Sequence, residues 1–305
     1  MALVLDGLIG NLATPLHRSY AMPPHRRQID HFVVGSSDAD ALEAQFIRLG
    51  FTLRPRSALT GAGLGLCNRG IFLEGSRYIE LLSVIDPDAV ARTRRQTARE
   101  TEAYGVPAIL AIRSGLIRLA ISTVDIPGTR AQAIELGYEV EGPVRHSVDF
   151  MHDGQRFQAL CEVIHAIRRN TPTLGCYFVN YLQDYDPSPF RTVPHPNGAL
   201  DAHAAVVVGT ADAVQPFLRL MSGGSGSTDM VEVMPPAAWE AMTGLQAESW
   251  HSLPYLAGMI FTVRDLAQTE RWMTERAIAV RTCGDRLMVP PHEAGNTALF
   301  FEQRR

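Results

Sequence analysis

Residues 29–51 read IDHFVVGSSDADALEAQFIRLGF, and this stretch decides the fold. It begins with a run of apolar and β-branched residues, which is typical of a buried strand. Asp38 then stands where a helix N-cap belongs, and Leu42 and Phe46 follow at helical spacing. Gly50 is the residue type that commonly ends a helix. The stretch therefore predicts a strand followed by a short amphipathic helix.

The same order returns in residues 116–138, which read LIRLAISTVDIPGTRAQAIELGY. Asp125 follows Asp38 by 87 residues, and Gly137 follows Gly50 by the same 87 residues. A single offset that aligns a strand, a cap and a helix end indicates an internal repeat.

Two further copies begin at His203 and at Leu256, and segments with strand character follow each copy. The repeating unit is thus one strand, one helix and about three strands. A single unit of this kind cannot bury the face of its own sheet, so units are expected to pair into a curved sheet around a cavity. We expect an α+β fold of four βαβββ modules, paired into curved sheets that enclose a metal or substrate cavity.

A stretch rich in Pro, Asp and Asn separates the second copy from the third. We expect residues 184–198 to form the junction between one half, residues 28–183, and a second half, residues 199–305. Residues 1–27 are expected either to pack on the body or to mediate oligomer contacts, which leaves a homodimer open.

Composition narrows the classes of function. The chain has 305 residues, 46% of them hydrophobic, and a formal net charge of −4, so it can bury a large core but has no electrostatic footprint for nucleic acid. Four widely spaced cysteines form no CxxC pair, which argues against a structural zinc site and a disulfide scaffold. The N-terminal segment lacks a basic leader region, and no stretch reaches transmembrane length. We expect a cytoplasmic protein with a small-molecule substrate and no nucleic-acid or membrane partner.

Two side chains in the first unit have metal-ligand chemistry. His31 lies in the first predicted strand, and Glu80 lies in RYIELLSV, where alternation places it on one face with Tyr78 and Leu82. A carboxylate in an apolar strand is unfavourable to bury unless it is paired or bound to a metal. A hydrogen-bonded structural histidine and a solvent-facing glutamate are the plain alternatives.

IDHFVV with its helix, LGF, CNRGIFLEG and RYIELLSV together resemble the glyoxalase-like branch of the vicinal oxygen chelate superfamily. PHPNGA at residues 194–199 also resembles the junction of its two-part members, and the resemblance covers most of residues 29–303. In that superfamily the metal ligands sit on the first and last strands of a module. The resemblance implies a divalent ion (Zn, Fe, Mn, Ni or Co) held by His31 and Glu80.

The second unit departs from this pattern. The offset of 87 places Arg118 at the position of His31. Counting along GQRFQALCEV against GSRYIELLSV places Ala159 at the position of Glu80. Neither side chain binds metals, so this unit is expected to be a scaffold or to contact the substrate through Arg118.

The third and fourth units offer one candidate ligand each. His203 lies on the first strand of the third unit, whereas the fourth has Gly258 on its first strand and Glu302 on its last. The full set of metal candidates is His31, Glu80, His203 and Glu302.

Further polar residues are candidates for substrate binding. Asn68 and Arg69 follow the Gly-rich turn GAGLGLCNRG and could place an amide and a guanidinium in the cavity, although a surface loop is equally compatible. His195, in PHPNG, is a candidate too, in a context typical of a turn.

This set favours a metal-dependent lyase or isomerase. A divalent ion would chelate two adjacent substrate oxygens and stabilise an enediolate while Glu80 or Glu302 removes a proton.

Two alternatives stay open. An extradiol-type dioxygenase needs two histidines and one carboxylate in one half, but Arg118 and Gly258 stand where the second histidine belongs. A non-catalytic protein that sequesters a small compound is the third reading.

Overall fold

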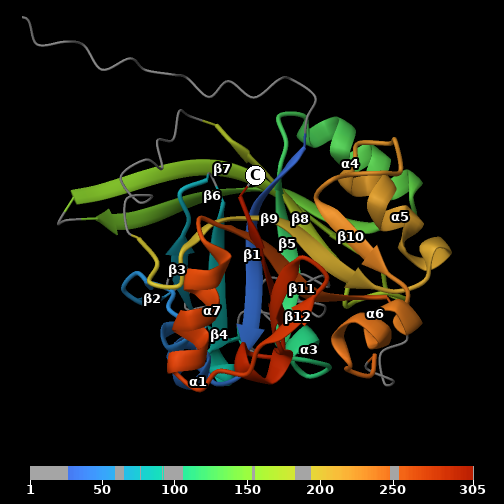
Figure 1. Cartoon of the computed structure of the whole chain (residues 1–305). Coiled ribbons are helices and arrows are strands. Elements are labelled where there is room, and N and C mark those ends of the chain that lie inside the picture. The colour runs from blue at the N-terminus through green and yellow to red at the C-terminus, as the bar shows by residue number, and fades with distance from the viewer. Residues whose placement is uncertain are drawn as a thin grey trace, which may run out of the picture.

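The structure is a computed structural model that describes residues 27–58, 65–75, 77–90, 92, 106–152, 155–182, 194–247 and 254–304. Within these residues the chain folds into two mixed sheets, with short helices packed on them (Figure 1). The predicted N-terminal extension lies almost entirely outside the described residues, as does most of the predicted junction. No helix in the described part of the chain is long and apolar enough to span a membrane.

The first unit has the predicted order of one strand, one helix and three strands. Asp38 caps the helix, since its side chain accepts a hydrogen bond from the backbone N–H of Ala41. Gly50 follows the helix with a φ of 84°, in the left-handed region that favours glycine. The elements are β1 (Gln28–Ser36), α1 (Ala39–Arg48), β2 (Ser57–Ala58), β3 (Leu66–Phe72) and β4 (Tyr78–Val84).

The second unit repeats this order. Its elements are β5 (Gly115–Ser122), α4 (Ile126–Glu135), β6 (Glu139–His152), β7 (Gln155–Ile167) and β8 (Gly175–Tyr181), preceded by α3 (Val106–Leu110). Asp125 caps α4 as Asp38 caps α1. Strands β1 and β5 pair antiparallel, with Phe32 opposite Leu119, its own counterpart 87 residues later. The offset of 87 residues therefore links residues that lie opposite each other across β1 and β5, as expected for two units related by a local two-fold axis.

The third unit is shorter than predicted. Its described elements are β9 (Ala199–Val208), α5 (Ala211–Met221), β10 (Val231–Met234) and helix α6 (Pro236–Thr243). Helix α6 starts directly after β10 because Pro235 and Pro236 cannot donate to a strand ladder, and Pro favours the first turn of a helix.

The fourth unit has the predicted strand order. It contains β11 (Tyr255–Val263), α7 (Leu266–Glu275), β12 (Arg281–Cys283), β13 (Arg286–Val289), the short helix η3 (Pro291–Glu293) and β14 (Ala298–Gln303). The first sheet has the order β2-β3-β4-β1-β5-β8-β7-β6, and the second has the order β10-β9-β11-β14-β13-β12. In all four units, the first strand and the last described strand of the unit pair in parallel.

The largest apolar cluster contains residues of both sheets and of helices α1, α4, α5 and α7. On β1, Phe32 and Val34 point into this cluster, whereas Val33 belongs to a separate cluster with Val106 and Ile109. Alternation therefore places His31 on the same side as Val33, away from α1. We call this side of the first sheet the His31 face.

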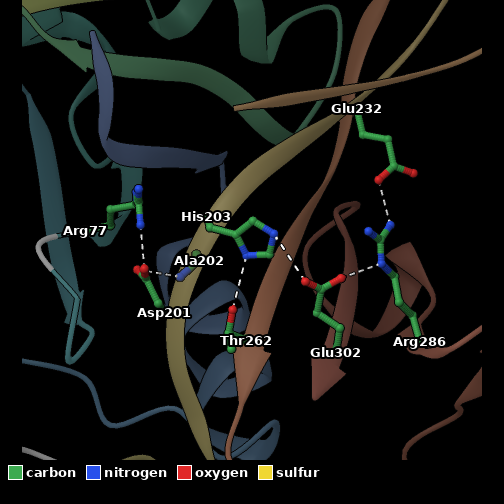
Figure 2. Close-up of polar contacts among 8 residues, drawn as sticks. All are labelled: Arg77, Asp201, Ala202, His203, Glu232, Thr262, Arg286 and Glu302. Carbon is green, nitrogen blue, oxygen red and sulfur yellow. Dashed lines mark hydrogen bonds and ion pairs between the residues drawn. The ribbon is translucent and has the colours of Figure 1, made fainter. Parts of the chain in front are cut away.

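The two sheets are also joined by polar contacts near the start of β9. The side chain of Arg77 forms an ion pair with Asp201 (Figure 2), and the backbone N–H of Gly75 donates to the carbonyl of Leu200 at 3.3 Å. A side chain at Gly75 would collide with the Asp201 carboxylate, so the close approach requires glycine here.

Candidate functional site

The His31 face carries a chain of three hydrogen-bonded side chains. Nδ1 of His31 lies 2.6 Å from the carboxylate of Asp30, and Nε2 contacts the hydroxyl of Tyr177 on β8. A carboxylate only accepts hydrogen bonds, so the imidazole proton sits on Nδ1 and Nε2 accepts from Tyr177. The arrangement links a carboxylate, an imidazole and a phenol in one proton-transfer chain.

Glu80 lies beside this chain. Its Oε2 is 3.7 Å from Nε2 of His31, and its Oε1 accepts a hydrogen bond from the amide of Asn68 at 2.6 Å. Asn68 reaches this face because β3 pairs with β4, with Asn68 opposite Leu82. The predicted pair of His31 and Glu80 therefore meets in space, and Asn68 orients the carboxylate.

Tyrosines enclose the imidazole. The ring of Tyr78 stacks on His31 with ring centroids 4.1 Å apart, and the hydroxyl of Tyr181 donates to Asp30 at 3.2 Å. His31 is 5% exposed. Burial raises the pKa of Tyr78 and of Tyr177 well above their ordinary value, so both phenols stay protonated at neutral pH.

Arg118 supplies a buried cation on β5. Burial lowers its pKa, while the negative charge of Glu80 opposes that shift. A guanidinium stays charged even when it is buried. Its register partner Gly175 leaves it room, because a Cβ there would lie 3.0 Å from Cγ of Arg118.

The register shows which residues are equivalent in the two units. His31 pairs with Tyr78 across β1 and β4, and Arg118 pairs with Gly175 across β5 and β8. Two residues further along the last strand lie Glu80 in the first unit and Tyr177 in the second.

Tyr177 is therefore the counterpart of Glu80, and the predicted counterpart, Ala159, is wrong. Ala159 lies on β7, which pairs with β6 and β8 but not with β5. The long β6–β7 hairpin precedes β8, the true last strand of the unit. The sequence QRFQALCEV resembles the last strand of the first unit, but it lies on β7.

The donor set on this face does not fit the three protein ligands of a typical catalytic metal site. His31 and Glu80 are two metal-ligating side chains, while Arg118 and Tyr177 stand at the matching positions of the second unit. In the parts of the chain that the structure describes, no three His, Cys, Asp or Glu side chains are arranged to hold a metal ion.

The second sheet brings together the other predicted pair (Figure 2). Nε2 of His203 on β9 lies 3.4 Å from Glu302 on β14, and Nδ1 accepts from the hydroxyl of Thr262 on β11 at 3.3 Å. Thr262, rather than the predicted Gly258, is the β11 residue beside His203. Gly258 instead pairs with Ala298.

Glu302 is also held by an arginine. Nε of Arg286 donates to Glu302 at 2.8 Å, and Nη1 of the same side chain donates to Glu232 at 2.7 Å. The four predicted ligands thus form two pairs on different sheets, His31 with Glu80 and His203 with Glu302. This second cluster is more open, since the side chain of His203 is 32% exposed.

Arg69 does not reach the His31 face. It pairs in register with Leu81, whose side chain belongs to the large cluster on the helix side of the sheet. There its guanidinium contacts Glu43 and the carbonyl of Arg54. Adjacent strand residues point to opposite faces, so Asn68 and Arg69 could not both face the cavity.

His195 is held by the backbone on both sides. Nδ1 accepts from the N–H of Thr52 at 3.0 Å, and Nε2 donates to the carbonyl of Phe72 at 2.9 Å. Burial lowers its pKa. Since both ring nitrogens are bonded to the backbone, His195 attaches the segment around residue 195 to the first unit.

Sequence reasoning missed Tyr177, Arg286 and Thr262. Their recognition depends on which strands pair, which a single sequence does not reveal. Asp30 gave a usable signal, because an acidic residue directly before a strand histidine is a ready partner for Nδ1.

Comparisons with known proteins bear on the fold. A family model described as a glyoxalase-like domain matches residues 29–219. A hypothetical protein from Staphylococcus aureus superimposes with a TM-score of 0.60 at 10% identity, over 91% of this chain and 100% of that one. A variant of 4-hydroxymandelate synthase from Streptomyces coelicolor gives a TM-score of 0.55 at 14% identity, over 93% of this chain and 94% of that one.

Methylmalonyl-CoA epimerase from Mycobacterium tuberculosis matches about half of the chain. Its TM-score is 0.35 at 14% identity, over 52% of this chain and 92% of that one. The comparison with curated proteins found no match. The match to the family model covers more than half of the chain, and the two longer superpositions confirm the architecture. The chain therefore belongs to the glyoxalase-like domain family and has the vicinal oxygen chelate fold expected from its sequence.

Proposed function

We propose that this chain is an enzyme of the lyase or isomerase type, which removes a proton from a carbon beside a carbonyl group of a small oxygenated substrate. The observation that carries the proposal is the meeting of a carboxylate, Glu80, with the chain Asp30–His31–Tyr177 on one face. A base and an acid with different environments, placed side by side, are what enediolate chemistry requires.

Glu80 is the proposed base. Asn68 fixes one of its oxygens, which leaves Oε2 on the side of His31 to accept the proton. Glu302, the other candidate base, has one oxygen bonded to the charged guanidinium of Arg286 on the second sheet, whereas Glu80 is bonded to the neutral amide of Asn68. This difference favours Glu80.

Tyr177 is the proposed acid. Its raised pKa keeps the hydroxyl protonated until it donates to the carbonyl oxygen as Glu80 takes the carbon proton. The phenolate recovers its proton from the enediol hydroxyl when Glu80 returns its proton to the neighbouring carbon, and His31 with Asp30 holds the phenol in place. Arg118 contributes a fixed positive charge near the developing negative charge. These roles need no side chain outside the described residues.

The predicted metal dependence stays a prediction. Nε2 of His31 and the carboxylate of Glu80 are the two donors that would contact a divalent ion, and a third is absent from the described residues. Elemental analysis of wild-type protein and of Glu80→Ala protein tests this separately from proton transfer. A stoichiometric ion that the variant loses would support a metal on this face.

The proposal is tested by hydrogen exchange in deuterated water. Wild-type protein is incubated with a panel of 2-hydroxy ketones, 2-oxo aldehydes and 2-substituted thioesters, and loss of the C–H signal is followed by NMR. We expect exchange on at least one class, abolished in Glu80→Gln. If several panel members bind yet none exchanges, the chain is a binding protein of this fold and the proposal fails.

A further inference from the structure

The second sheet is curled so that its distant strands meet through one arginine. In the strand order, β10 and β13 are separated by β9, β11 and β14. Nevertheless Arg286 of β13 contacts both Glu302 of β14 and Glu232 of β10 (Figure 2). The guanidinium therefore bridges β14 and β10 across the curved sheet, on the face that carries His203.

The acceptors around Arg286 have the chemistry of a metal site. The imidazole of His203 and the carboxylates of Glu232 and Glu302 are an N- and O-donor set that first-row divalent ions accept. His203 lies 3.4 Å from one oxygen of Glu302, and Arg286 binds the other oxygen.

A guanidinium and a metal ion would compete for these oxygens. The planar fork of arginine is permanently charged and satisfies two carboxylates at once. Its 2.8 Å and 2.7 Å bonds take Oε2 of Glu302 and Oε2 of Glu232. A second cation beside the fork would be repelled by it, and these three acceptors do not converge on one point in the described structure.

We propose that Arg286 takes the place of a metal ion in the second sheet. Its positive charge holds Glu232 and Glu302 together across the curved sheet, and His203, Glu232 and Glu302 form a divalent-metal site once the guanidinium is removed. The inference concerns the second sheet alone and stands independently of the proton transfer proposed for the His31 face.

Binding of Co²⁺ to the Arg286→Ala variant tests this inference. Visible absorption reports the coordination of the ion, and calorimetry gives its affinity and stoichiometry. We expect Arg286→Ala to bind one more equivalent of Co²⁺ than wild type binds. The dissociation constant of this site should be at least about tenfold lower than that of any Co²⁺ binding by wild type. The double variant Arg286→Ala with Glu302→Gln should return to the wild-type affinity, because a ligand is lost.

Two controls keep the result specific. Arg169→Ala also removes one arginine from an ion pair with a glutamate, but its partner Glu139 lies on β6 of the first sheet, so this variant should leave Co²⁺ binding unchanged. Arg286→Gln keeps an amide donor for Glu302 without the charge, and serves if Arg286→Ala does not fold. The inference is overturned if the folded variants bind Co²⁺ no better than wild type, or if wild type binds it at this site and loses it in His203→Ala.

Discussion

At the scale of single residues, hydrogen-bond partners decide what a buried histidine can do. His31 and His195 are both almost fully buried. The nitrogens of His195 are bonded to backbone groups of Thr52 and Phe72, so that ring is a structural fastening. The ring of His31 instead joins the side chains of Asp30 and Tyr177, which can exchange protons.

Tyr177→Phe removes the proposed acid and leaves the ring in place. We expect kcat to fall by roughly 10²-fold or more, with little change in the free energy of unfolding, since general acid catalysis contributes about 10²–10⁴-fold. Steady-state kinetics on a substrate found by exchange, together with urea denaturation, measures both. Tyr138→Phe is the control, because Tyr138 is buried on the helix side of the sheet. An unchanged kcat in Tyr177→Phe would remove the tyrosine from the mechanism.

His195 makes stability depend on pH. Its folded-state pKa is lowered by burial, so below about pH 6.5 the unfolded chain binds more protons than the folded one. The contribution of His195 to stability is therefore complete above that pH and is lost as the pH falls towards the folded-state pKa. Urea denaturation between about pH 8 and pH 5 should show a steeper loss for wild type than for His195→Gln. Parallel curves for the two proteins would exclude this role.

At the scale of elements, the helices of the first half were predictable and the strand pairing was not. Asp38, Gly50, Asp125 and Gly137 act through the local backbone, and all four stand at the predicted helix ends. Tyr177 depends on β8, and β8 can be recognised only when the β6–β7 hairpin is known. Likewise, nothing local to β10 reveals that Glu232 meets a strand four places away in the sheet.

The two helix-ending glycines provide a matched test. Gly50 and Gly137 have φ of 84° and 80°. A Cβ on Gly50 would lie 2.5 Å from Nε1 of Trp272, whereas the nearest atom to a Cβ on Gly137 is 3.9 Å away. We expect Gly137→Ala to lower the free energy of unfolding by about 1 kcal/mol, through backbone strain alone. Gly50→Ala should lower it by about 2–4 kcal/mol, because a collision is added. Equal losses in chemical denaturation would mean that Trp272 moves aside freely.

At the scale of the whole molecule, the two sheets share one fold but differ at the matching positions. The first sheet carries an enclosed imidazole, two phenols and a buried cation, and the second carries an open imidazole and two carboxylates joined by Arg286. The sequence predicted His31 and Glu80 as candidates in one half, and His203 and Glu302 as candidates in the other. It could not predict that they form two separate clusters, because sheet curvature and strand order decide that.

Turnover should not require oxygen. A dioxygenase of this fold needs two histidines and a carboxylate on a redox-active ion. The described second sheet instead offers His203, Thr262 and Glu302 together. We expect equal rates in aerobic and anaerobic assays of the same sample, and no uptake at an oxygen electrode. Stoichiometric oxygen consumption, with activity only in iron- or manganese-loaded protein, would favour a dioxygenase over a lyase or isomerase.

The central claim is that Glu80 on the first sheet, rather than Glu302 on the second, removes the substrate proton. The most direct measurement compares Glu80→Gln with Glu302→Gln in the same deuterium-exchange assay, on the same substrate and at the same protein concentration. The account predicts that Glu80→Gln slows exchange by about 10²–10⁴-fold, while Glu302→Gln stays within a few-fold of wild type. Loss of exchange in Glu302→Gln with full exchange in Glu80→Gln would contradict the account and place the chemistry on the second sheet.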